Sequence, residues 1–230
     1  FAPAGFKDPD LAEATAKLAR KFGISKEEQD NWSINSHSNA LKSREILRSE
    51  ITPVLNQTND LFARELNQKI CKRAPKLSDT ITHANSAIAA DAASFVVLVS
   101  ELFLKNKMCK GVEVLGSGTS GVIPEEAPLA PVGAIKALLD QTKISLSNVA
   151  FIELMEAYAA QAIICTRLCD LDLDKVNLRG GALSRGHPIG ASGAILVVRL
   201  FNELIKTPGA SGMAAIAAAG GIGSAMMLKS

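Results

Sequence analysis

Strand-like and helix-like segments alternate through the second half of this 230-residue chain. The segment GVEVLGSGTSG resembles a strand followed by a loop, and NVAFIELME resembles a strand. Helical patterns follow them at 130–142 and 157–171. A third helical pattern at 191–205 leads into MAAIAAAGGIGSAMMLKS, which is typical of two short strands around a glycine turn. Strands that alternate with helices in this way predict a layered α/β domain.

The first half of the chain has a different character. Apolar residues fall on one face of a helix over 10–22, and Ser25 then precedes Glu28 by three residues, which is the capping-box spacing. This spacing predicts a long amphipathic helix that ends near Ser49. From 51 to 79 the chain is polar and contains prolines, so we expect an irregular excursion there.

The continuous apolar run Phe95–Val99 predicts a strand that is buried on both faces. A strand of this kind exposes unpaired N–H and C=O groups unless neighbouring strands cover it. We therefore expect either a missing half of the fold or a second protomer to cover this segment.

Composition excludes several classes of partner. The net charge of +2 is too small to indicate a nucleic-acid surface, and the basic residues form no block. No basic and apolar leader opens the chain, and glycines interrupt its longest apolar run, so we expect no contact with a membrane. The expected compartment is the cytoplasm, or an organelle matrix in a eukaryote. The first residue is Phe rather than Met, which suggests that other residues precede it.

The four cysteines form no C-x-x-C pair, and none lies near a histidine at the spacing of metal ligands. We therefore expect a reducing compartment and no metal site. Cys165 and Cys169 lie one helical turn apart in an apolar segment, and we interpret them as small core residues rather than as a redox pair.

The stretch RGGALSRGHPIGASGA holds His187 between Gly186 and Pro188, in a backbone that cannot continue a helix or a strand. A histidine on a rigid turn can polarise a carbonyl or activate a nucleophile. It can equally be part of a glycine-rich connection and bond only to backbone. The glycine spacing matches neither a dinucleotide fingerprint nor a phosphate-binding loop. The later segment AIAAAGGIGSA could present main-chain N–H groups to an oxyanion, or form a tightly packed hairpin.

Taken together and in this order, AFIELMEAYAAQ, GGALSRGHPIGASGA and AAAGGIGSA resemble the C-terminal half of the thiolase family. The resemblance extends to EEAPLAPVGAIKALLDQ and ISKEEQDNWSINSHSNAL, so it covers nearly the whole chain. It implies a thiolase-like layered α/β/α fold. Residues 1–83 would be the inserted loop region, 84–110 the end of the N-terminal domain, and 111–230 a complete C-terminal domain. The family forms dimers or tetramers, so the resemblance implies an oligomer.

The resemblance also implies the site residues. His187 stands at the family histidine that activates a cysteine nucleophile and helps to hold the thioester oxygen. Met155 stands where the family has an asparagine that orients a water, and a thioether cannot donate that hydrogen bond. Ala217 stands at the family's second cysteine, and alanine cannot carry a proton.

Residues around coenzyme A are implied more loosely. Ala87 stands at a serine that usually contacts the pantetheine, and Tyr158 and Gly220 fall in the region that binds coenzyme A or the oxyanion. The family's nucleophilic cysteine belongs to the N-terminal half, and none of the four cysteines here matches its motif. We expect no cofactor, with a coenzyme A thioester as the substrate.

Two functions follow from this resemblance. The first is a thiolase-like acyl-CoA acyltransferase, for 3-ketoacyl-CoA thiolysis or acetyl-CoA condensation, in which this chain alone is inactive or strongly impaired. The alternative is a non-catalytic thiolase-like subunit that binds coenzyme A or serves in assembly. An unrelated α/β binding module would require the ordered motifs to coincide by chance.

Overall fold

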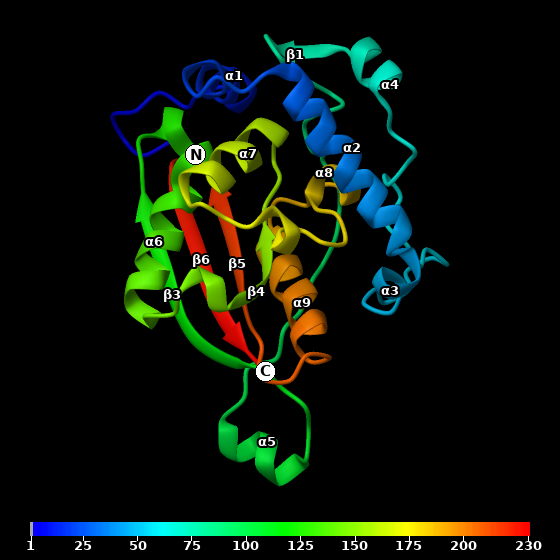
Figure 1. The fold of residues 1–230 in the computed structure, drawn as a ribbon, viewed down its shortest axis with the longest axis vertical. Coiled ribbons are helices and arrows are strands. Elements are labelled where there is room, and N and C mark those ends of the chain that lie inside the picture. The colour runs from blue at the N-terminus through cyan, green and yellow to red at the C-terminus, as the bar shows by residue number, and fades with distance from the viewer. Residues whose placement is uncertain (1) are drawn as a thin grey trace.

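The structure, a computed structural model, describes residues 2–230 and is built around a four-stranded mixed sheet (Figure 1). The strand order is β3 (Glu113–Gly121), β6 (Ile222–Lys229), β5 (Ser211–Ala218) and β4 (Val149–Leu154). β4 and β5 run parallel, whereas β6 is antiparallel to both of its neighbours. The carboxyl ends of β4 and β5 therefore lie at the same edge of the sheet.

Helices cover both faces of this sheet. Side chains of α6 (Ala130–Thr142) and α7 (Ala159–Leu168) pack in one apolar cluster with Met213 of β5. Side chains of α9 (Ser192–Leu204) pack in another cluster with the next residue of the strand, Ala214. Because successive strand residues point to opposite faces, the two clusters lie on opposite sides of the sheet. The predicted layered α/β/α fold is confirmed.

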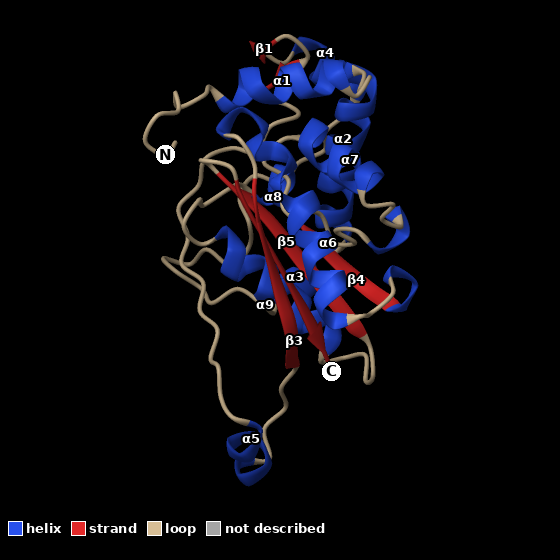
Figure 2. Cartoon of the chain, turned by 90° about the vertical axis from the view of Figure 1, so that its left-hand side faces the viewer, coloured by secondary structure: helices blue, strands red, loops and turns tan. Residues whose placement is uncertain are grey.

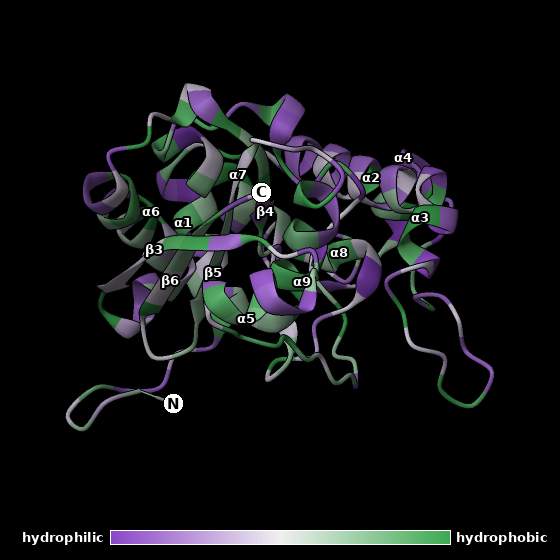
Figure 3. Ribbon diagram, turned by 90° about the horizontal axis from the view of Figure 1, so that it is seen from below, coloured by the Kyte–Doolittle hydropathy of each residue, from purple (hydrophilic) through white to green (hydrophobic). Residues whose placement is uncertain are grey.

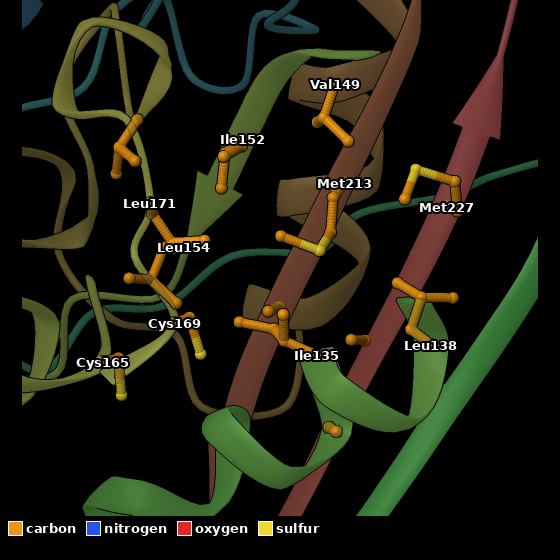
Figure 4. Packing of buried hydrophobic residues seen from close by; sticks show 14 of the residues in the cluster. Ile135, Leu138, Val149, Ile152, Leu154, Cys165, Cys169, Leu171, Met213 and Met227 are labelled. Atoms are coloured by element: carbon orange, nitrogen blue, oxygen red, sulfur yellow. The ribbon is translucent and has the colours of Figure 1, made fainter. Parts of the chain in front are cut away.

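The larger cluster forms the core between α6 and the sheet, and Figure 4 shows its side chains packed together. Cys165 and Cys169 belong to this cluster, which confirms that they are small core residues. Burial raises the pKa of Cys165 to about 12 and that of Cys169 to about 11. Neither thiol therefore ionises near neutral pH.

The predicted capping box starts α2 (Lys26–Lys42). The Glu28 N–H donates to Ser25 Oγ at 3.2 Å, and the Ser25 N–H donates to Glu28 Oε2 at 2.8 Å. The helix ends earlier than predicted, because the backbone at Ser43 leaves helical geometry, and α3 (Arg44–Arg48) then continues.

The remaining elements are one further helix of three turns and several shorter segments. They are α1 (Leu11–Lys21), α4 (Gln68–Arg73), β1 (Lys76–Ser78), β2 (Ile81–Thr82), α5 (Glu101–Lys107), α8 (Ala182–Arg185) and 3₁₀ turns at Pro124–Leu129, Leu146–Asn148 and Leu173–Lys175. The predicted irregular excursion over 51–79 thus contains one short helix and one short strand. Over residues 2–230, no helix is both long enough and apolar enough to cross a membrane.

Residues 91–110, which we call the arm, project from the body of the molecule and carry α5 at their tip (Figure 2). The prediction of a buried strand at Phe95–Val99 is wrong for this chain: 91–100 are neither helix nor strand, and Phe95, Val97 and Leu98 are 86%, 85% and 81% exposed. The physical reason is that no described strand pairs with this segment. Figure 3, seen from the end where α5 projects, shows hydrophobic residues on this helix.

Candidate active site

The structure brings Met155 and Ala217 to the same edge of the sheet. Leu154 at the end of β4 pairs with Ala215 of β5, and the Met155 N–H donates to the Ala215 carbonyl at 2.9 Å. Ala217 lies two residues farther along β5, and Gly220 follows in the turn to β6 with a φ of +88°. Three of the predicted site residues therefore gather where these strands end.

His187 follows α8 on a turn that requires glycine. Gly186 has a φ of +95°, and a Cβ there would lie 2.9 Å from the ring of Phe62. The His187 N–H donates to the Ile88 carbonyl at 2.8 Å, and its Nδ1 lies 2.7 Å from Ser192 Oγ. Backbone and ring are thus both anchored, which fixes the direction of the imidazole.

Residues 85–89, which we call the strap, connect His187 to the end of β4. The Ala87 N–H donates to the Ala157 carbonyl at 2.9 Å, and Ser86 forms a bridge with Tyr158. Ala89, at the other end of the strap, forms a bridge with His187. Ala87, Tyr158 and His187 are therefore held beside one short extended segment.

Met155 occupies an apolar environment. Its side chain is 1% exposed and belongs to the cluster that contains Leu196 and Leu200 of α9, with Ala87 packed against it. No hydrogen-bond donor is available from this side chain. Ala217, half-buried opposite Gly223, offers no group that can carry a proton. Of the predicted catalytic positions, only His187 has a side chain that can donate a hydrogen bond or transfer a proton.

The His187 imidazole is half-buried, and burial is the main cause that lowers its pKa below the ordinary value. The positive charge of Arg185 lowers this pKa further. The ring is therefore neutral near pH 7 and carries its single proton on one of its two nitrogens.

Glu156 is a site residue that sequence reasoning missed. It is 1% exposed, and its carboxylate accepts hydrogen bonds from Trp32 Nε1 at 3.0 Å, Ser36 Oγ at 2.8 Å, Asn177 Nδ2 at 2.7 Å and the Leu183 N–H at 3.3 Å. These donors come from α2, the 176–181 loop and α8, so one carboxylate joins the three segments behind the histidine turn. The available signal was an acidic residue two positions after a buried strand.

A second buried polar cluster lies under α9. Arg199 is 3% exposed, and its Nη1 donates to both carboxylate oxygens of Glu50 at 2.7 and 2.6 Å. Glu153 Oε1 and Glu203 Oε1 lie 3.8 and 3.7 Å from Arg199 Nη2. Burial raises the pKa of Glu153 to about 7, against the opposing effect of Arg199. This cluster ties the segment after α3 to the face of the sheet that α9 covers.

The elevated pKa of Glu153 predicts a pH-dependent stability. A carboxyl group whose pKa is raised by folding stabilises the folded state while it is protonated. For Glu153 this contribution is complete below its unfolded pKa of 4.5 and is lost as the pH rises through about 7. Between pH 5 and pH 9, the free energy of unfolding of the wild type should fall by roughly 3 kcal/mol relative to that of Glu153→Gln. Urea titrations of both proteins at pH 5, 7 and 9 measure this difference. Glu65→Gln, at an exposed position, should parallel the wild type. If the free energy of unfolding changed with pH in the same way for Glu153→Gln and the wild type, Glu153 would not be the group that causes the pH dependence.

The described residues contain no cluster of three His, Cys, Asp or Glu side chains placed to bind a metal ion. What the candidate site presents is one neutral imidazole, apolar side chains at the strand ends, and a glycine turn between β5 and β6.

Comparison with known proteins identifies the family of this chain. The family model for the thiolase C-terminal domain matches residues 110–230, and that for the thiolase N-terminal domain matches residues 5–102. A Bacillus subtilis (strain 168) protein named as a candidate acetyl-CoA C-acetyltransferase, YhfS, is 34% identical over 100% of this chain and 66% of its own length. A Staphylococcus aureus (strain COL) protein, named a probable acetyl-CoA acyltransferase, is 36% identical over 86% of this chain and 55% of its own.

Solved structures show the same fold. The crystal structure of the Bacillus anthracis acetyl-CoA acetyltransferase superposes with a TM-score of 0.89 at 28% identity, over 96% of this chain and 61% of that one. Human mitochondrial 3-ketoacyl-CoA thiolase superposes with a TM-score of 0.86 at 27% identity, over 96% and 59%. The chain belongs to the thiolase family. It spans between about half and two thirds of the length of these relatives.

Proposed function

We propose that this chain is the C-terminal part of a thiolase-type acyl-CoA acyltransferase, for 3-ketoacyl-CoA thiolysis or acetyl-CoA condensation, and that it is inactive or strongly impaired alone. The observation that carries the proposal is His187, anchored by Ile88 and Ser192 beside the strand ends that hold Met155 and Ala217. In this role the imidazole would bind the thioester oxygen and activate the cysteine nucleophile.

The proposed organisation assigns 1–83 to the loop region, 84–110 to the end of the N-terminal domain and 111–230 to the C-terminal domain. The substrate is a coenzyme A thioester, and no other cofactor is required. Ala87, Tyr158 and Gly220 are the proposed contacts with coenzyme A or the oxyanion, because the strap and the β5–β6 turn place them around the same strand ends.

The chemistry of the cysteines supports a nucleophile from outside these 230 residues. A thiolate is the reactive form, and burial raises the pKa of Cys71, Cys165 and Cys169. Cys109 is exposed, but it lies on the arm just after α5. We therefore place the nucleophile in a thiolase N-terminal half.

The exposed apolar residues of the arm also favour a thiolase N-terminal half as the partner of this chain. Phe95 and Val97 on one face of the extended segment are exposed, and so is Leu98 on the other. A strand that is apolar on both faces belongs inside a sheet with layers above and below it. A second copy that paired only along the strand edge would leave both faces in water. An N-terminal half, with its own sheet and helices, covers the edge and the faces together, and the complete protein is then an oligomer by family resemblance.

The alternative, a non-catalytic subunit that binds coenzyme A or serves in assembly, is favoured by Met155 and Ala217. Neither side chain can supply the hydrogen bond or the proton of the family position it occupies. The two functions differ in whether binding of a coenzyme A thioester leads to turnover.

The test compares this chain alone with a fusion to the N-terminal half of the Bacillus subtilis relative. The chain alone should show no acetoacetyl-CoA thiolysis above its own His187→Ala variant. The fusion should show weak thiolysis that His187→Ala lowers by about a hundredfold or more. His187-dependent turnover by the chain alone would overturn the proposed external nucleophile. A fusion that binds coenzyme A without turnover would support the non-catalytic alternative instead.

A matched variant tests the role of the arm. Val97→Lys should leave the stability of the isolated chain within about 0.5 kcal/mol, because this side chain is already exposed. When the N-terminal half is supplied as a separate polypeptide, the same variant should prevent its association. Association at wild-type affinity would show that the arm is not the docking segment.

A further inference from the structure

The hydroxyl of Ser192 lies between two possible acceptors. Ser192 Oγ is 2.7 Å from His187 Nδ1 and 3.0 Å from the Pro188 carbonyl. A serine hydroxyl has one proton and can donate it to only one of these groups at a time. Which group receives the proton decides where the neutral His187 ring carries its own.

The Pro188 carbonyl already accepts two hydrogen bonds. The Ala191 N–H and the Ser192 N–H both donate to it at 2.9 Å, and a carbonyl oxygen has two lone pairs. The hydroxyl proton would be a third donor at this oxygen. His187 Nδ1 is closer and faces a side chain that is itself only 1% exposed. If the hydroxyl donated to Pro188 O instead, Nδ1 would carry the ring proton and donate it to Ser192 Oγ, and the Pro188 oxygen would face three donors for two lone pairs.

We infer that Ser192 donates its hydroxyl proton to His187 Nδ1 and so fixes the imidazole in the tautomer that carries its proton on Nε2. In this state the free edge of the ring presents a hydrogen-bond donor rather than a base. Ser192 is a positioning residue, because it acts through His187. The inference rests on the proposed function only for the identity of the group that meets Nε2, a thioester oxygen.

The chemical consequence is that His187 Nε2 cannot act as a hydrogen-bond donor and as a base at the same time. The Nε2–H can stabilise negative charge on a thioester oxygen at once, which matters more where Met155 supplies no donor. To accept a proton from a nucleophile, Nε2 must first lose its own. Nε2 releases its proton to solvent water and Nδ1 takes one proton from solvent, so the ring stays neutral. The Ser192 hydroxyl rotates toward Pro188 O in this exchange and accepts from the Nδ1–H. Donor and base are therefore two states of the same pair, with the donor state favoured at rest.

Nitrogen-15 NMR of the imidazole rings tests this inference on the chain itself, which has only three histidines to assign. In the wild type the His187 proton should be bonded to Nε2, with Nδ1 unprotonated. Ser192→Ala should lower the ratio of the Nε2–H to the Nδ1–H tautomer by roughly fivefold, the contribution of one ordinary hydrogen bond. Ser192→Asp should place the proton on Nδ1, since a carboxylate only accepts, and should raise the pKa of His187.

Ser184→Ala is the matched control. Ser184 is equally buried, its hydroxyl donates to the Gly181 carbonyl at 2.9 Å, and its removal should leave the His187 ring signals unchanged. A wild-type spectrum with the proton on Nδ1 would overturn the inference. An Ser192→Ala spectrum with an unchanged ratio would overturn it as well, and these two proteins decide the matter even if Ser192→Asp does not fold. The spectra report the protonation of the ring and require no turnover. The tautomer inference can therefore be confirmed or refuted whether or not the thiolysis assay supports the proposed function.

Discussion

Replacing Glu156 by alanine is expected to lower the free energy of unfolding by about 3–5 kcal/mol. The carboxylate is 1% exposed and satisfies donors from Trp32, Ser36, Asn177 and Leu183. Alanine leaves these buried donors without an acceptor, and each unpaired buried group costs about 1–3 kcal/mol unless a neighbour or water replaces the bond. The contacts that hold α2, α8 and the 176–181 loop together are then weakened.

Urea denaturation measured by circular dichroism gives this change directly. Glu156→Gln should lose less stability than Glu156→Ala, because its amide oxygen still accepts hydrogen bonds. It should still be less stable than the wild type, because its N–H₂ group faces donors and cannot accept from them. Glu65→Ala, a substitution of an exposed glutamate, should stay within about 0.5 kcal/mol of the wild type. An alanine variant at position 156 within about 1 kcal/mol of the wild type would show that the carboxylate does not hold these segments together.

The second large effect concerns the two substituted catalytic positions. In a protein that includes the N-terminal half, Met155→Asn combined with Ala217→Cys is expected to raise thiolysis by at least about a hundredfold, the usual contribution of one oxyanion donor or one proton-transfer group. Asparagine would return a donor to the end of β4, and cysteine would return an ionisable group near the end of β5. The change at Met155 should also reduce stability by about 1–3 kcal/mol, because an amide enters an apolar cluster.

Met155→Leu is the matched control for this experiment. It keeps an apolar side chain of similar volume in the same cluster and adds no donor, so the rate should not rise. A gain in rate with leucine would attribute the effect to packing instead of to hydrogen bonding.

Local signals in the sequence account for much of the fold. The capping box at Ser25 and Glu28 depends on residues three apart, and it forms as predicted. The strand over 149–154 follows from its apolar residues, and the alternation with helices predicts the layers. The strand over 113–121 is longer than predicted, because it continues through SGTSG, where a loop is expected, and pairs there with β6. The run Phe95–Val99 has the same local character and yet forms no strand here. Apolar character alone cannot show whether a neighbouring strand is present to complete the hydrogen bonds.

The candidate site divides in the same way. His187 could be selected from the sequence because the glycines and the proline around it indicate a turn rather than a helix or a strand. The cluster at Arg199 could not, since its closest partner, Glu50, lies 149 residues away and only the folded chain brings the two together. Glu156 was hidden for the same reason, because its four donors come from segments that are distant in sequence.

The most direct test of the central claim is the initial rate of acetoacetyl-CoA thiolysis, measured for the wild type and for the Met155→Asn, Ala217→Cys double variant with the N-terminal half present. The account predicts a double variant at least about a hundredfold faster than the wild type, and loss of that gain when His187→Ala is added. A double variant no faster than the wild type, or a gain that survives the loss of His187, would contradict the account of this chain as a thiolase site that retains its histidine and lacks its other two catalytic side chains.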